Sequence, residues 1–125
     1  DFTSQKKYVA AVSSTMDYLL GRNPIDQSYV TGYGARPLRN PHHRFFAAQA
    51  RKDRPAPPPG IVSGGANSSV QDPYARGAGL LGQPPQKCFL DHIESWSTNE
   101  VTINWNAPLV WVASFLDEQA QTASP

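Results

Sequence analysis

The residues best suited to chemistry cluster near the C-terminal end of the chain. Carboxylates and indole rings are interleaved there: Asp91, Glu94, Trp96, Glu100 and Trp105. Carboxylates transfer protons and hydrogen-bond hydroxyl groups, while indole rings cover the apolar face of a pyranose. This pattern favours a site that binds or cleaves sugars. A solvated acidic loop in front of a core helix is the plainer alternative, and composition gives it similar weight.

The three carboxylates differ in their neighbours. Glu100 precedes an aromatic, apolar run, which is a suitable setting for a general acid. Asp91 lies beside His92 and can accept hydrogen bonds while it stays ionised. It is therefore expected either to take part in the chemistry or to brace a loop. Glu94 is the least clearly placed of the three.

A second candidate cluster follows Pro41, where His42, His43 and Arg44 are adjacent. Imidazole and guanidinium groups side by side can hydrogen-bond sugar hydroxyls or hold a carboxylate ionised. Surface histidines with an ordinary salt bridge are the plainer alternative. A metal site would need four side chains: His42, His43, Asp91 and His92. Adjacent histidines do not easily converge on one ion, and neither CxxC nor HExxH is present, so no metal ligand is expected here.

Bulk properties bound the class of protein. A chain of 125 residues is long enough for one domain and too short for two. The net charge is +1 and no long run of basic residues is present, so no nucleic-acid partner is expected. No apolar run approaches the roughly 20 residues that span a bilayer, and no signal-peptide pattern is present, so no membrane partner is expected either. Cys88 is alone and forms no internal disulfide.

Two helices are expected to position these residues. Apolar side chains from Tyr8 to Leu20 recur at helical spacing, Thr3 or Ser4 can cap the start, and Gly21 can end the helix in a left-handed conformation. Residues 27–31 are expected to be extended. From Gly32 to Ser97 no period persists, and prolines and glycines are frequent. We interpret this span as long functional loops on a scaffold that lies mostly elsewhere.

The last helix has two candidate starts. Ser97 with Glu100 fits a capping box, whereas Asn106 as cap with Pro108 in the first turn fits the preference of proline for that position. The second is favoured, because proline kinks a helix interior. From Pro108 to Leu116 the helix is apolar nearly all round, with Trp111 expected in the core. Such a helix needs cover on every side, which the rest of this chain does not supply.

Two motifs resemble the signatures of glycoside hydrolase family nine, the older cellulase family E. The first runs from Ser28 to Arg36 and, after four residues, continues with Pro41-His42-His43-Arg44. The second runs from Phe89 through Asp91, Trp96 and Glu100 to Asn106-Ala107. Leu19–Pro24 is also similar to the family. The likeness covers nearly the whole chain, which corresponds to the C-terminal quarter or so of one family catalytic domain over residues 1–125.

The resemblance implies an all-α fold, the last part of an (alpha/alpha)6 barrel, incomplete on its own. It implies hydrolysis of β-1,4-glucan such as cellulose with inversion at the anomeric carbon. Glu100 matches the general acid, Asp91 the acid that orients the site, and His42 and Arg44 the sugar-binding pair. Trp105, and with it Trp96, is assigned to sugar stacking.

The resemblance also implies what is missing. An inverting hydrolase needs a second carboxylate about 6.5–9.5 Å from the acid, and the aspartate base of the family lies in an upstream motif absent here. The chain is therefore expected to be inactive alone and to need the N-terminal remainder of the domain as a companion. No cofactor is expected in this chain, and structural calcium or zinc would belong to the missing part. The family implies a secreted or periplasmic enzyme.

Three alternatives remain open at this level. An exo-acting cellodextrinase or glucosaminidase of the same family is one, with the insert Phe45–Lys87 narrowing one end of the cleft. A non-catalytic carbohydrate-binding fragment that keeps Trp96, Trp105 and His42 as contacts is another. A purely structural remnant is the third.

Overall fold

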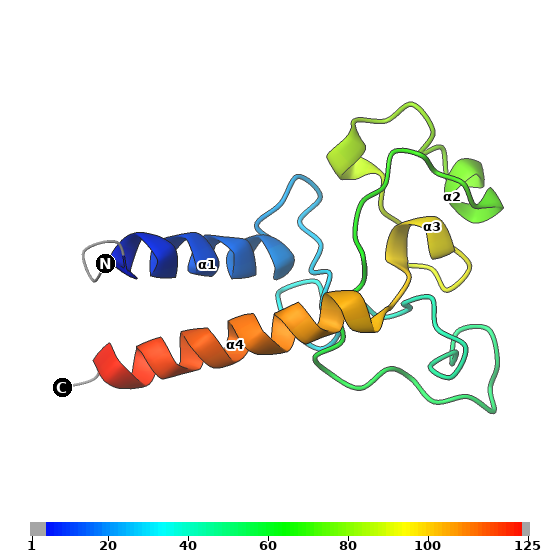
Figure 1. Cartoon of the computed structure of the whole chain (residues 1–125). Helices are drawn as coiled ribbons and strands as arrows, with labels where there is room; N and C mark the ends of the chain where they lie inside the picture. The colour runs from blue at the N-terminus through cyan, green and yellow to red at the C-terminus, as the bar shows by residue number, and fades with distance from the viewer. Residues whose placement is uncertain (1–4, 124–125) are drawn as a thin grey trace.

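The computed structural model describes residues 5–123 and is helical at both ends (Figure 1). Its elements in chain order are α1 (Gln5–Leu19), α2 (Pro73–Gly77), the 3-10 turn η1 (Pro85–Lys87), α3 (Trp96–Asn99) and α4 (Ile103–Ala123). Within residues 5–123 extended pairing is confined to isolated bridges: Val30 with Val62, Thr31 with Leu38, and His42 with Glu100. No helix in this described part is long and apolar enough to cross a membrane.

The two long helices lie side by side and antiparallel, and the loops gather at one end of the pair (Figure 1). At the opposite end, where both termini lie, Gln5 Nε2 donates to Gln119 Oε1 at 3.2 Å. The C-terminal end of α1 and the start of α4 therefore both face the loops. This arrangement places the stretch around Glu100 where the loops meet the helices.

The first helix ends as its sequence predicts. α1 stops at Leu19, and Gly21 follows with a φ of 122°, in the region that favours glycine. Asn23 completes the end, because its Nδ2 donates to the carbonyls of Tyr18 at 2.9 Å and Gln27 at 2.7 Å. The caps expected at residues 3 and 4 lie outside the described residues.

The predicted start of the last helix is wrong. α4 begins at Ile103 and runs to Ala123, with Pro108 inside it. The reason is a long-range contact: Asn106 Nδ2 donates to the carbonyls of Thr102 at 2.8 Å and Val62 at 3.0 Å, while its Oδ1 accepts from Val62 N–H at 3.0 Å. Asn106 thus anchors a first turn already formed before it. The capping box at Ser97 is also absent, because Ser97 lies inside α3, which begins at Trp96, and Glu100 is the residue that ends that helix.

The loops carry a core of their own, which the sequence did not predict. One buried cluster joins residues far apart in sequence: Tyr29, Val30, Leu38, Val62 and Phe89. A smaller cluster joins Val70, Ala75 and Cys88 beside the short helix α2. The ring centroids of Tyr29 and Phe89 are 4.8 Å apart in an edge-on contact. The proline-rich span is therefore packed, although only α2, η1 and α3 within it are helical, none of them predicted.

The two long helices, in contrast, have no fully buried residue among those whose burial is described, which are all of α1 and residues 103–122 of α4. Trp111, expected in the core, is 65% exposed, and Val110 is 66% exposed. Two apolar hollows flank the contact between the helices, of about 280 Å³ beside Trp105 and Pro108 and about 430 Å³ beside Leu109 and Leu116. Within the described residues nothing covers these faces.

Candidate active site

Glu100 lies where α3 ends and α4 is about to begin, in an extended conformation that closes α3. Its side chain lines an open cleft of about 240 Å³. One group of lining residues is the loop segment 64–67, and the other comprises Trp96, Ser97 and Thr98, together with Trp105 from α4. Glu100 itself is exposed. The expected acid and both expected stacking residues therefore meet in one cleft.

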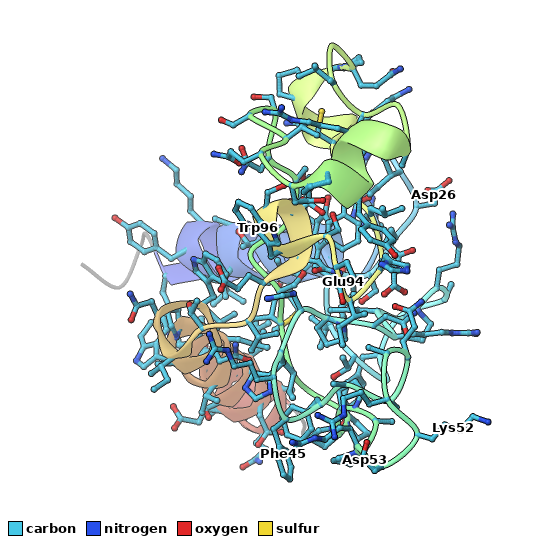
Figure 2. The ribbon with its side chains drawn as sticks, turned by 90° about the vertical axis from the view of Figure 1, so that its right-hand side faces the viewer. Asp26, Phe45, Lys52, Asp53, Glu94 and Trp96 are labelled. Atoms are coloured by element: carbon cyan, nitrogen blue, oxygen red, sulfur yellow. The ribbon has the colours of Figure 1, made fainter. Side chains whose placement is uncertain are left out.

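The two tryptophans offer ring surface to this cleft. Trp96 is 42% exposed and Trp105 is 41% exposed, so neither is the core residue that a lone tryptophan usually is. Figure 2 shows Trp96 on α3, at a distance from the loop tip that carries Phe45, Lys52 and Asp53. Half-exposed indole rings in the same cleft as a carboxyl group suit a sugar ring, whose faces are apolar and whose edges are polar.

Gly64 determines where the ring of Trp105 lies. A Cβ atom added to Gly64 would stand 2.5 Å from Trp105 Cη2, so the indole rests directly on the backbone of this glycine. The N–H of Gly64 also donates to the carbonyl of Glu100 at 3.0 Å. Gly64 therefore joins the segment 64–67 to both the acid and its neighbouring aromatic residue.

His42 is fastened beside Glu100 through the backbone. The two residues form an isolated parallel bridge, and Val101 N–H donates to the carbonyl of His42 at 3.4 Å. His42 Nδ1 lies 2.5 Å from the carbonyl of Ile93, which accepts only, so Nδ1 carries the proton. In the neutral ring Nε2 is then the acceptor. The imidazole is held in one orientation with one nitrogen left for a ligand.

Asp91 braces a loop with both of its oxygens. Oδ2 accepts from Arg39 N–H at 3.0 Å, and Oδ1 accepts from Asn40 N–H at 2.7 Å. These bonds hold the two residues that precede Pro41 and His42. Both carboxylate oxygens of Asp91 therefore accept hydrogen bonds from the backbone. This arrangement fits equally well a residue that orients the site and a residue that only braces the loop.

The remaining histidines make local contacts. His43 Nδ1 accepts from the N–H groups of Phe45 and Phe46, both at 3.2 Å, and its ring stacks on Phe46. His92 stacks on Tyr74 with ring centroids 4.4 Å apart. Across residues 5–123 no three of the side chains that bind metals gather closely enough to hold an ion.

Arg44, expected to bind sugar with His42, is exposed and lines none of the clefts described above.

Asp72 clamps the turn that carries Trp96. It is fully buried and accepts from Ala75 N–H at 2.6 Å, from Ser97 N–H at 3.2 Å, from Ser95 Oγ at 3.4 Å, and from the Ser97 hydroxyl. Burial alone would raise the pKa of Asp72, but these four hydrogen bonds outweigh it and hold the pKa below its ordinary value. The carboxylate stays ionised and ties α2 to the start of α3.

Several residues hold the site together in ways that were not predicted from the sequence: Gly64, Asn67, Asp72, Asn99 and Asn106, the last of which was expected only as a helix cap and as part of a motif. Asn67 Nδ2, for example, donates to the carbonyl of Ser97 at 2.9 Å. One signal was readable, since Asp72 followed by Pro73 is a typical helix start. The others gave no signal for these roles, because each has a decisive partner that lies 30 or more residues away in the chain.

Comparison with known proteins places this chain in a family. The sequence profile of Glycosyl hydrolase family 9 matches residues 1–113. The chain is 58% identical over 118 residues to a cellulose 1,4-beta-cellobiosidase of Acetivibrio thermocellus, covering 94% of this chain and 13% of that protein. It is 45% identical over 121 residues to endoglucanase C of Cellulomonas fimi, covering 95% of this chain and 11% of that protein.

Solved structures agree in fold. A thermostable endoglucanase from Alicyclobacillus acidocaldarius is 46% identical with a TM-score of 0.76, over 86% of this chain and 20% of that one. A metagenome-derived glycoside hydrolase family 9 endoglucanase is 38% identical with a TM-score of 0.71, over 90% of this chain and 19% of that one. Such enzymes are (α/α)6 barrels, of which this chain spans about a fifth, so the expected fold class is confirmed. Profile, relatives and structures together show that the chain belongs to Glycosyl hydrolase family 9.

Proposed function

We propose that this chain forms the acid-bearing part of an inverting hydrolase of β-1,4-glucans such as cellulose. The observation that carries the proposal is the cleft that Glu100 lines together with Trp96 and Trp105. Relatives whose names describe a cellobiosidase, an endoglucanase and a cellodextrinase support β-glucan as the substrate class.

In this mechanism Glu100 protonates the glycosidic oxygen as the bond to the anomeric carbon breaks. The indole rings of Trp96 and Trp105 support the sugars on either side of the bond, and His42 Nε2 accepts a hydrogen bond from a sugar hydroxyl. Arg44 adds a second polar contact when the substrate chain reaches it. Asp91 acts through the loop it braces and holds His42 in place.

The base that activates water is proposed to come from a part of the catalytic domain not represented among these residues. An inverting site separates its two carboxyl groups by about 6.5–9.5 Å, which leaves room for that water. The same part of the domain is proposed to cover the apolar faces of α1 and α4, including Val110 and Trp111. Whether it belongs to the same polypeptide or to a companion chain does not change this requirement.

The test is to replace Glu100 in the complete catalytic domain. Glu100→Gln is expected to lower kcat/KM on cello-oligosaccharides by about 10²-fold or more, the usual contribution of general acid catalysis. The matched control is Glu94→Gln, on the exposed loop just before α3 (Figure 2), which is expected to change activity less than about 3-fold because Glu94 does not line the cleft of Glu100. Equal, small effects of both substitutions would contradict the assignment.

Exo action is the second candidate, and it is favoured by the name of the relative that is 58% identical, a cellobiosidase. The segment 64–67 belongs to the insert between Phe45 and Lys87 and lines the cleft. An exo-acting domain is expected to release mainly cellobiose from the start of the reaction, whereas an endo-acting domain first releases longer oligomers. Product analysis on cellulose, cello-oligosaccharides and chitosan oligomers distinguishes these modes and the glucosaminidase alternative.

We further propose that the protein works outside the cytoplasm, because a cellulose chain is too large to cross a membrane. Fractionation of the producing cells, with activity measured in medium and cell extract, tests this point. Activity that is found only in the fraction that contains the cytoplasmic markers would contradict it.

A further inference from the structure

Asn99 connects the loop that carries His42 to the segment that carries Asp91 and Glu100. It directly precedes Glu100, has no exposed surface, and has a side chain that bonds only to backbone groups. We propose that Asn99 is the positioning residue that sets Glu100 against His42, so that removing its hydrogen bonds reduces acid catalysis more than it reduces sugar binding. This inference rests on the function proposed above.

The amide of Asn99 bridges three segments. Its Nδ2 lies 3.0 Å from the carbonyl oxygens of Asn40, Leu90 and His92. Asn40 is in the loop that leads to His42, whereas Leu90 and His92 flank Asp91. Two amide protons are thus shared among three acceptors, and the loop before His42 is tied to the loop around Asp91.

The carbonyl groups of Asn99 complete the junction. Its side-chain Oδ1 accepts from His42 N–H at 3.1 Å, and its backbone oxygen accepts from the same N–H at 3.2 Å. On the other side of Glu100, Val101 N–H donates to the carbonyl of His42. The backbone of His42 is therefore fastened immediately before and immediately after the acid, and the two side chains share one rigid base.

An uncharged amide is required at this position. An aspartate of the same shape would present an oxygen without a proton to three carbonyl oxygens, and its charge would be buried without a cation among its contacts. A buried acceptor facing other acceptors costs the structure its hydrogen bonds and repels the loops. We expect the backbone around Glu100 to move apart from His42. A displacement of about 1 Å at a reacting group can cost about 10²-fold in rate.

The experiment compares two substrates in the complete catalytic domain. Cellotetraose has a poor leaving group and needs a proton from the acid, whereas a dinitrophenyl β-cellobioside has a leaving group that departs without one. For Asn99→Asp we expect kcat/KM to fall at least about 10-fold on cellotetraose and less than about 3-fold on the activated substrate. The ratio of the two values does not depend on the fraction of folded enzyme, so partial misfolding does not affect the result. Asn99→Ser, which adds no charge, is measured in parallel.

The matched control is Asn23→Asp. Asn23 makes a similar set of backbone bonds at the end of α1 but lines none of the clefts around Glu100. It is expected to lower the melting temperature while leaving the ratio unchanged. Glu100→Gln provides the reference ratio for complete loss of the acid. A reference ratio equal to wild type would overturn the proposed function itself. A shifted reference with an unshifted ratio for both Asn99 variants would overturn the positioning role alone.

Discussion

The loop region and the helical pair of this chain are stabilised in opposite ways. Residues 27–100 contain the buried residues of the structure, and polar groups such as Asp72 and Asn99 tie them together with hydrogen bonds. The pair α1 and α4 is regular in secondary structure yet buries no side chain among the residues described. Regular secondary structure is thus not what holds the candidate site.

This difference indicates a division of work. Hydrogen bonds are directional, so a network of them sets the positions of Trp96, Glu100 and His42 within the loops. Apolar faces are not directional, and those of α1 and α4 provide attachment for whatever covers them. Trp105 and Leu109 on α4 are two of the places where the regions touch, against Gly64 and the loop core. Substitutions in the helical pair, at this contact and in the loops therefore test the division separately.

The largest effect is expected in the helical pair. In the complete domain Val110→Asp would place a charge in the interface that covers α4, at a cost of about 3–5 kcal/mol, as for an uncompensated buried charge. Gln121→Glu is the matched control, since it adds the same charge three turns further along, where Gln121 bonds to exposed Asp117. Its expected cost is about 0.5 kcal/mol. Unfolding in guanidinium chloride measures both, and equal small costs would mean that this face stays in solvent.

An intermediate effect is expected where the two regions touch. Gly64→Ala would drive a methyl group to 2.5 Å from the Trp105 ring and displace it from the cleft. We expect kcat/KM on cello-oligosaccharides to fall about 10–100-fold, as for a small displacement of a positioned group. In Gly77→Ala, by comparison, the added methyl meets no atom within 4 Å, and activity should stay at the wild-type level. Steady-state kinetics of the two variants give the comparison, and matching kinetics would refute the role of Gly64.

The smallest effect is expected in the loops and depends on pH. Asp72→Asn replaces one carboxylate oxygen by a donor that faces other donors, at a cost of about 1–3 kcal/mol at pH 7. Because the folded pKa of Asp72 lies below its ordinary value of 3.8, the stability it adds is present above that value and is lost as the pH falls through the folded pKa. The free energies of unfolding of wild type and variant should therefore converge below about pH 4. Urea titrations at pH 7, 5 and 3 measure this, and a constant difference would exclude the ionised carboxylate as the cause.

Local features were predicted well because their causes are local. The end of α1 follows from the apolar spacing up to Leu20 and from Gly21, all within a few residues. The start of α4 was misplaced because Asn106 is anchored to Val62, 44 positions earlier in the chain. Trp111 was expected to be buried because its helix is apolar, but within the described chain it is 65% exposed. Burial is a property of the assembled domain, so a local pattern cannot supply it.

By itself, the sequence determined the family, the two long helices and the residue types that gather in the cleft, since all three depend on motifs and periods within single segments. Only the tertiary structure decided which residues hold that cleft together. Asn99 and Gly64 act through contacts with Asn40 and Trp105, which are distant in the chain and adjacent only after folding. A hydrogen bond or a close packing contact needs its partner within a few ångströms, and the fold brings that partner there.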